Sequence, residues 1–106
     1  MTQTTTEDAA AERFIQRYDA GAARLIRAVS LGGATGERIE QLLVSLTDGG
    51  PGPDMGRLIG NADQENVAAI VAVIKGQALL GVHPALDRWR MERAMKGHEG
   101  KEGPGT

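Results

Sequence analysis

The residue types that most often carry catalysis are few in this chain and are not arranged for it. His83 precedes a proline, and His98 lies in a glycine-rich C-terminal segment; neither belongs to a metal-binding spacing such as HExxH. No serine lies in a GxSxG turn, and the chain has no cysteine, which excludes thiolate zinc sites and cysteine nucleophiles. We therefore expect no enzyme, no cofactor and no metal site, and we expect His83 to be a helix cap or a solvated side chain.

A glycine-rich segment, Gly32 to Gly36, comes before an expected helix, where backbone N–H groups can hold an anion. Its spacing differs from the phosphate-binding pattern GxxxxGK[ST], it follows an expected helix rather than a strand, and Glu37 would repel phosphate. These features favour a plain turn between two helices.

The stretch from Gln77 to Arg90 has the pattern of two helices joined by a tight turn at Gly81-Val82. Its general form, Leu-Gly-Val-x-Pro followed by Arg-Trp, resembles helix-turn-helix regulators over about fourteen residues. The second helix has an excess of basic residues that could contact DNA phosphates, namely Arg88, Arg90, Arg93 and Lys96. The alternative is a helical hairpin that buries Trp89 in the core.

The same helix has a second apolar side. At 100° per residue, Met91, Ala94 and Met95 lie nearly opposite Leu86 and Trp89. One core cannot easily bury both sides, and exposed methionines are common on binding surfaces, so we predict that these three residues contact a protein partner or a second copy of the chain. The alternative is a frayed last turn with two exposed methionines.

The elements that position these residues are predicted to be helices. Apolar spacing and glycine or proline breaks predict an all-α fold, a compact bundle of four helices over about 7–30, 35–47, 63–80 and 84–96. Thr6 and Thr35 are the expected N-caps of the first two helices. Four arginines of the first helix lie off its apolar stripe: Arg13, Arg17, Arg24 and Arg27.

The second and third helices are connected by a Gly/Pro-rich crossover loop, 48–60, in which Asp54 could cap a single turn. We expect Met55, Leu58 and Ile59 to pin this loop to the core. In the third helix, residues 67–74 are apolar all round, which predicts a helix buried on most sides. A buried strand is the alternative, while a membrane span would need a longer apolar run.

With 106 residues the chain has room for one domain, which we place at 7–97 between disordered tails at 1–6 and 98–106. The net charge of −2 gives no general signature of nucleic-acid or membrane binding, and the start of the chain does not read as a secretory signal. We expect a bacterial, cytoplasmic protein that does not bind membranes. The predicted function is a small non-enzymatic interaction module that forms a homo-oligomer or binds a protein partner through its C-terminal helix. The alternative is a small, phage-scale DNA-binding regulator that uses the 84–96 helix.

Overall fold

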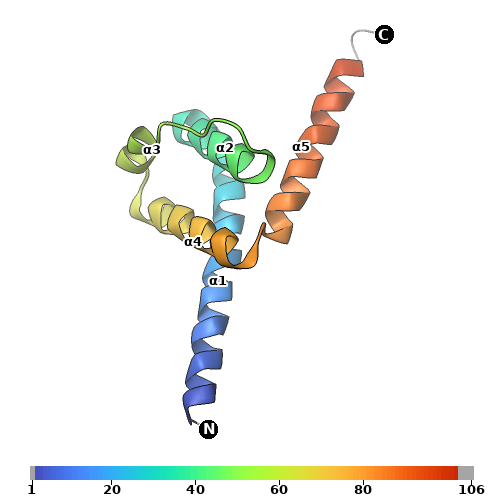
Figure 1. Ribbon diagram of the computed structural model, residues 1–106. Helices are drawn as coiled ribbons and strands as arrows, with labels where there is room; N and C mark the ends of the chain where they lie inside the picture. The colour runs from blue at the N-terminus through green and yellow to red at the C-terminus, as the bar shows by residue number, and fades with distance from the viewer. Residues whose placement is uncertain (1, 103–106) are drawn as a thin grey trace.

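The computed structural model describes the backbone of residues 2–102 and the side chains of residues 8–96, and all of its described elements are helices. They follow one another in the order α1 (Thr2–Leu31), α2 (Gly33–Asp48), α3 (Met55–Asn61), α4 (Gln64–Leu80) and α5 (Pro84–Glu102). Figure 1 shows α4 crossing the middle of the long helix α1, with α2 and α3 beside it. The prediction of an all-α fold is confirmed.

The core lies where α2 and α4 pack against the C-terminal half of α1. Each helix contributes one stripe of buried side chains, as expected for amphipathic helices around a common core. The buried residues are Tyr18, Ala22 and Leu25 of α1, Ile39, Leu42 and Leu43 of α2, Leu58 of α3, Ala69, Ile70 and Val73 of α4, and Leu86 of α5. Tyr18 is the one aromatic residue among them, so the core is almost entirely aliphatic.

Gly76 of α4, which has no side chain, lies directly against the ring of Tyr18 of α1. The ring of Tyr18 occupies the space that a Cβ atom at Gly76 would need. An alanine at this position would force the ring or the helix to move, and overpacking of this kind costs about 1–3 kcal/mol. The contact fixes the C-terminal end of α4, from which α5 begins.

Aspartate side chains cap the N-termini of α3 and α4. An Oδ1 atom of Asp54 accepts a hydrogen bond from the Arg57 N–H at 3.2 Å, and that of Asp63 accepts one from the Asn66 N–H at 2.7 Å. Each cap satisfies one of the N–H groups that have no partner within the first turn of a helix. The sequence predicted this role for Asp54.

The two expected threonine caps are wrong. Helix α1 begins at Thr2, which places Thr6 inside it, and α2 begins directly after Gly32, which places Thr35 within its first turn. Gly32 has a φ of 76°, a backbone conformation that glycine adopts without strain, so the chain turns there and needs no side-chain cap.

The prediction of four helices is wrong by one, because the expected crossover loop 48–60 contains α3. The capping aspartate and the burial of Leu58 stabilise two helical turns where we expected one, and the irregular segment shrinks to residues 49–54. Leu58 does reach the core as predicted. Met55 and Ile59 do not, because they are 38% and 39% exposed on the outer side of this short helix.

Both terminal helices are longer than predicted. Helix α1 reaches back to Thr2 and α5 extends to Glu102, so residues 2–6 and 98–102, which we expected to be disordered, continue existing helices. Lengthening a formed helix adds one backbone hydrogen bond per residue and needs no new nucleus, an effect the tail composition did not reveal. Residues 1 and 103–106 of the predicted tails lie outside the described part of the chain.

Helix α4 is buried on one side only, contrary to the prediction of burial on most sides. Ile70 and Val73 face the core, whereas Val71 and Ile74 are 42% and 40% exposed. The reason is the small number of neighbours: α1 packs along one face of α4, α2 reaches α4 through the hydrogen bond from Gln77 to Leu46, and no described element packs extensively on the opposite face.

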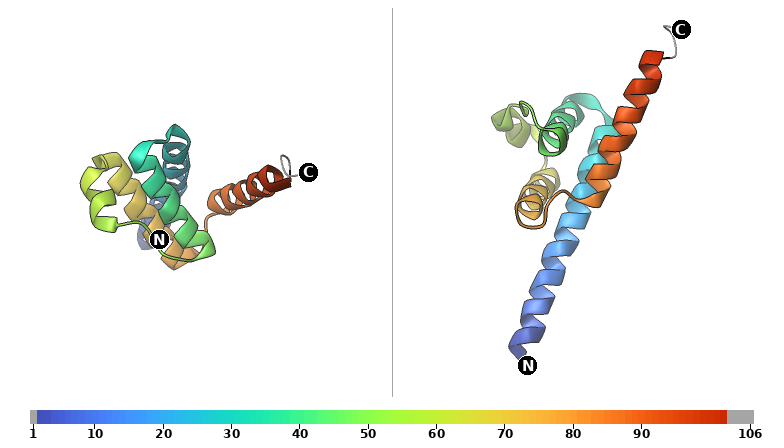
Figure 2. Two further views of the ribbon diagram at one scale, coloured as in Figure 1. Left: turned by 90° about the horizontal axis from the view of Figure 1, so that it is seen from above. Right: turned by 45° about the vertical axis from the view of Figure 1, so that its right-hand side comes forward.

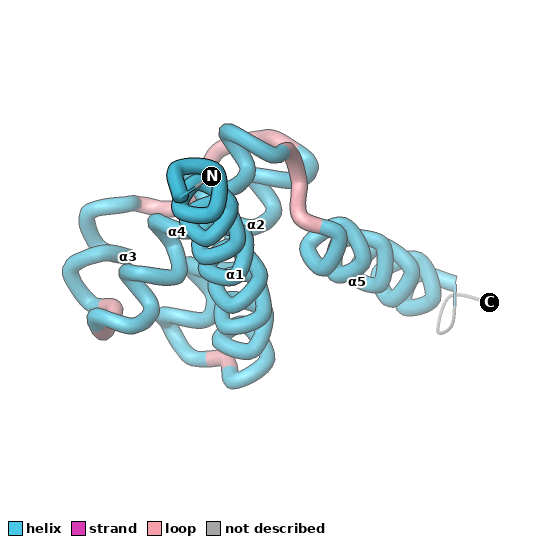
Figure 3. Tube along the Cα trace, turned by 90° about the horizontal axis from the view of Figure 1, so that it is seen from below, coloured by secondary structure: helices cyan, strands magenta, loops and turns pink. Residues whose placement is uncertain are grey.

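The N-terminal half of α1 and most of α5 extend beyond this core, so that the molecule measures 65 × 29 × 22 Å. The start of α1 and the end of α5 lie at opposite ends of the molecule (Figure 1). Two further directions of view, in Figures 2 and 3, show α5 projecting away from the cluster of the other helices.

Candidate interaction site on helix α5

Helix α5 is attached through the turn that precedes it. The Tyr18 hydroxyl donates a hydrogen bond to the Gly81 carbonyl oxygen at 2.6 Å, and the Tyr18 and His83 rings meet edge to face with centroids 4.8 Å apart. Gly81 has a φ of 83°, which glycine accommodates readily, so α4 can end there and the chain can turn. Burial raises the pKa of Tyr18, an effect partly opposed by a hydrogen bond from the backbone of His83.

His83 caps the N-terminus of α5, one of the two roles that we expected for it. Its Nδ1 atom accepts a hydrogen bond from the Ala85 N–H at 3.0 Å, and its Nε2 atom lies 2.6 Å from Oδ1 of Asp19. Because Nδ1 accepts this hydrogen bond, Nε2 carries the hydrogen and donates a hydrogen bond to Oδ1 of Asp19. The imidazole therefore joins α5 to α1, and both of its nitrogens are engaged in holding the turn.

The core-facing side of α5 is anchored by one fully buried residue, Leu86, with Trp89 half-buried against the core. The helical-hairpin alternative predicted Trp89 in the core; Trp89 packs against the core but is only partly buried, and this packing also suits a helix-turn-helix. A second hydrophobic face of α5 therefore has no place in the core.

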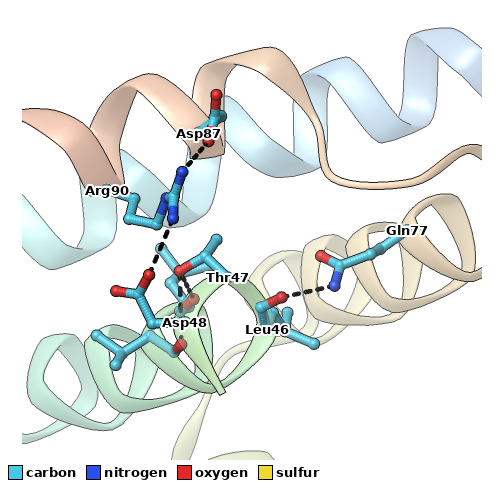
Figure 4. Close-up of polar contacts among 8 residues, drawn as sticks. Leu46, Thr47, Asp48, Gln77, Asp87 and Arg90 are labelled. Carbon is cyan, nitrogen blue, oxygen red and sulfur yellow. Dashed lines mark hydrogen bonds and ion pairs between the residues drawn. The ribbon is translucent and has the colours of Figure 1, made fainter.

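Arg90 connects α5 to the end of α2. One of its terminal nitrogens lies 3.2 Å from Oδ1 of Asp48 and the other lies 2.7 Å from Oδ1 of Asp87, so the guanidinium bridges two carboxylates (Figure 4). A hydrogen bond to Asp87, and to a smaller extent one to Asp48, raises the pKa of Arg90 above its usual range. Nearby, the Gln77 side-chain N–H group donates to the Leu46 carbonyl at 2.7 Å and joins α4 to α2.

Arg93 makes a second connection between α5 and α2. Its Nε atom lies 3.1 Å from Oε1 of Glu40, and its guanidinium carbon lies 5.9 Å from the centre of the Trp89 ring, within the range of a cation–π contact. Two of the four basic residues predicted to contact DNA, Arg90 and Arg93, are therefore used inside the chain.

The other predicted residues lie on the exposed part of α5. Met91 and Met95 are 56% and 63% exposed, and Ala94, Arg88 and Lys96 are also exposed. Since Met91 and Met95 are one helical turn apart, they form a single apolar strip, with Arg88 and Glu92 along one flank. We call Met91, Ala94 and Met95 the methionine face.

Sequence reasoning missed the partners that orient α5. Asp19, Glu40 and Asp48 are polar side chains of other helices, and the pattern of a single sequence does not show which arginine or histidine each one meets. The residues that join α5 to these helices are separated by 42 to 64 positions along the chain. The capping role of His83 was visible because it depends on residues close by.

The sequence favoured a plain turn at the glycine-rich segment 32–36; in the structure Gly32 alone connects α1 and α2, and residues 33–36 are the first turn of α2. Gly32 and Gly33 both have positive φ angles, and a Cβ atom at Gly36 would lie 2.9 Å from the Ala28 carbonyl oxygen. Gly36 therefore allows α1 and α2 to pack closely.

Among the described helices, none alone is long and apolar enough to cross a membrane; α4 and α5 meet that test only together, across a bend of 101°. Comparisons with protein-family models, with curated proteins and with solved structures find no match to this chain.

Proposed function

We propose that this protein is a non-enzymatic helical interaction module in which the methionine face of α5 binds a second copy of the chain. The observation that carries the proposal is that the two sides of α5 have different surroundings. Its arginines at positions 90 and 93 are turned to α2, while Met91 and Met95 are more than half exposed on the outside. Flexible methionine side chains adapt well to a facing helix.

The charges beside the methionine face favour a second copy as the partner. In an antiparallel pair of helices related by a two-fold axis, the same flank of each helix meets its equivalent. Arg88 and Glu92 lie on one flank, four residues apart. A pairing centred between them sets Arg88 opposite the partner's Glu92, and Glu92 opposite the partner's Arg88, with the methionines packed between the two helices.

The small size of the core also favours self-association. A chain of about one hundred residues buries a limited share of its surface, and area buried between subunits adds to its stability. Helix α5 has most to gain, because it contributes a single fully buried residue to the core of its own chain.

The test is the molar mass by size-exclusion chromatography with light scattering. The wild type is expected to be a dimer at micromolar concentration, and Met91→Asp with Met95→Asp is expected to be monomeric, because a charge in an apolar interface cannot be solvated. Met55→Asp is the matched control, since Met55 lies on α3 and is also exposed. A wild type that stays monomeric at all concentrations would overturn the self-association, and so would a dimer that both sets of variants preserve.

A second candidate function, DNA binding by α5, is favoured by the geometry of the α4–α5 turn. Three residues, 81–83, separate the helices, and the bend of 101° lies within the range of helix-turn-helix motifs. Only Arg88 and Lys96 of the predicted contacts are without a carboxylate partner among the described residues. If this function holds, Arg88→Ala with Lys96→Ala weakens binding to duplex DNA at low salt; unchanged binding, or none by the wild type, argues against it.

A further inference from the structure

The strongest one-sided concentration of charge in the described part of the chain lies on α1, outside the site on α5. Arg13, Arg17, Arg24 and Arg27 fall within about 80° of one another around the helix axis and span about 21 Å along it. We call these four residues the arginine stripe. The acidic side chains described on α1, which are those of Asp8, Glu12 and Asp19, lie on a different side of the helix.

The stripe faces away from the core. Arg13, Arg17 and Arg27 are exposed, and in the described residues no carboxylate lies within ion-pair distance of any of them. Arg24 is different. It lies 2.9 Å from Glu65 and donates a hydrogen bond to the Asn66 side-chain oxygen at 2.8 Å. Three arginines of the stripe are thus available to an anion, and the fourth is held in place by α4.

The surface along the stripe is hollowed, and the apolar part of its lining consists mostly of alanine. Two adjoining hollows of about 300 and 420 Å³ follow it, the first beside Arg17 and Arg24 and the second beside Arg24 and Arg27. Ala20 lines both hollows, and each also has one carboxylate, Glu65 in the first and Asp63 in the second, both of which lie against Arg24. Since most of the apolar lining is alanine, an extended charged ligand could lie close to the helix.

We propose that the arginine stripe binds the phosphodiester backbone of a nucleic acid. Guanidinium groups match phosphate oxygens in geometry and charge, and a row of them about 21 Å long suits a polymer with a regularly spaced negative charge. A protein partner would need large apolar side chains to bury, and among the residues that line the two hollows the only large one is Leu31, at one end of the stripe. The site is separate from α5 and does not depend on its methionine face.

The probe is a fluorescent 20-base-pair duplex DNA of mixed sequence, followed by anisotropy with the full-length chain at several salt concentrations. Three available arginines predict a slope of log K against log[salt] of about −2.7, which is a loss of roughly 40-fold in affinity between about 50 and about 200 mM salt. The triple variant Arg13→Gln, Arg17→Gln, Arg27→Gln is expected to bind at least about tenfold more weakly at about 50 mM salt. Glutamine is nearly as good a helix former as arginine, and circular dichroism verifies that α1 remains folded.

The control variant is Arg38→Gln, Arg57→Gln, Lys75→Gln, which makes the same change in net charge on α2, α3 and α4 and is expected to bind DNA nearly as the wild type does. The proposal is overturned if the wild type gives no anisotropy change at low salt or if the two triple variants lose the same affinity. A polyglutamate peptide that competes as strongly as DNA of equal charge would also overturn it, in favour of an acidic protein as the ligand.

Discussion

The two longest helices, α1 and α5, are attached to the core in different ways. Helix α1 buries Tyr18, Ala22 and Leu25 along one face and is crossed by two other helices, whereas α5 buries Leu86 alone. Because α5 buries so little area, it is held mainly by polar contacts at its start and by two arginines that form ion pairs with α2. The arginines of the two helices differ accordingly. Most of those on α1 are exposed to solvent, whereas two of the three on α5 form ion pairs with α2.

This difference shows why the number of arginines on a helix does not measure its capacity to bind an anion. The sequence gives α5 an excess of basic residues, but Asp48 and Glu40 neutralise two of them. Helix α1 has carboxylates of its own, yet they lie on another side from the arginine stripe. The available charge is decided by the side chains that meet across helices.

The largest expected effect concerns the single buried anchor of α5. Leu86→Ala should destabilise the protein by about 2–5 kcal/mol, because it removes a fully buried leucine from the contact that holds the helix. Urea unfolding followed by the fluorescence of Trp89, the only tryptophan, measures the change. Leu79→Ala, at a leucine of α4 that is 73% exposed and lies outside the methionine face, is the comparison and should change stability by less than about 0.5 kcal/mol. Equal effects of the two substitutions would contradict the anchoring role of Leu86.

A smaller effect is expected at the hydroxyl of Tyr18, which joins α1 to the turn before α5. Tyr18→Phe removes the hydrogen bond to Gly81 and should cost about 1 kcal/mol. Because the pKa of Tyr18 is raised in the folded protein, its contribution is complete below the ordinary value of about 10 and is lost as the pH rises through the raised value.

Thermal unfolding at a series of alkaline pH values tests how the stability contributed by Tyr18 changes with pH. The wild type should lose more stability than Tyr18→Phe as the pH passes about 10, and the absorbance of tyrosinate in the folded protein should appear above that pH. Since the chain has one tyrosine, the absorbance belongs to Tyr18. An identical pH dependence of the two proteins would show that Tyr18 does not carry it.

The smallest expected effect compares one arginine from each helix. Arg90→Gln should lower the Tm slightly, because Asp48 and Asp87 lose their shared partner, and high salt should remove most of the difference from the wild type. Arg27→Gln should leave the Tm unchanged at every salt concentration, since no described carboxylate lies beside Arg27. A loss at Arg27 as large as that at Arg90 would remove the distinction between the two helices.

Much of the fold follows from local sequence features. The apolar spacing of α1, the capping aspartates and the glycine breaks predict the all-α fold and the positions of four helices, since each depends on residues within a few turns of one another. The helix over 55–61 was underestimated because three glycines and two prolines precede it and two more glycines lie within it, while its stability comes from the burial of Leu58 in the core. Helix propensity alone does not include this contribution from tertiary packing.

The candidate site was predictable in part. The outward position of Met91 and Met95 follows from helix periodicity once Leu86 and Trp89 face the core. The pairing of Arg90 and Arg93 with α2 does not, because it depends on how α2 and α5 are placed in space. The exposed face of α4 was missed for a similar reason: Val71 and Ile74 are apolar enough to be buried, but the chain has too few helices to cover them.

A charge exchange across the proposed α5 interface tests whether two copies of the helix pair. Arg88→Glu and Glu92→Arg are each expected to weaken dimerisation by roughly tenfold or more, because each places like charges opposite one another. The double variant Arg88→Glu, Glu92→Arg restores opposite charges and should recover a molar mass, by light scattering, close to that of the wild-type dimer. A double variant as monomeric as the single variants, or single variants as dimeric as the wild type, would contradict an antiparallel pairing of two copies of α5.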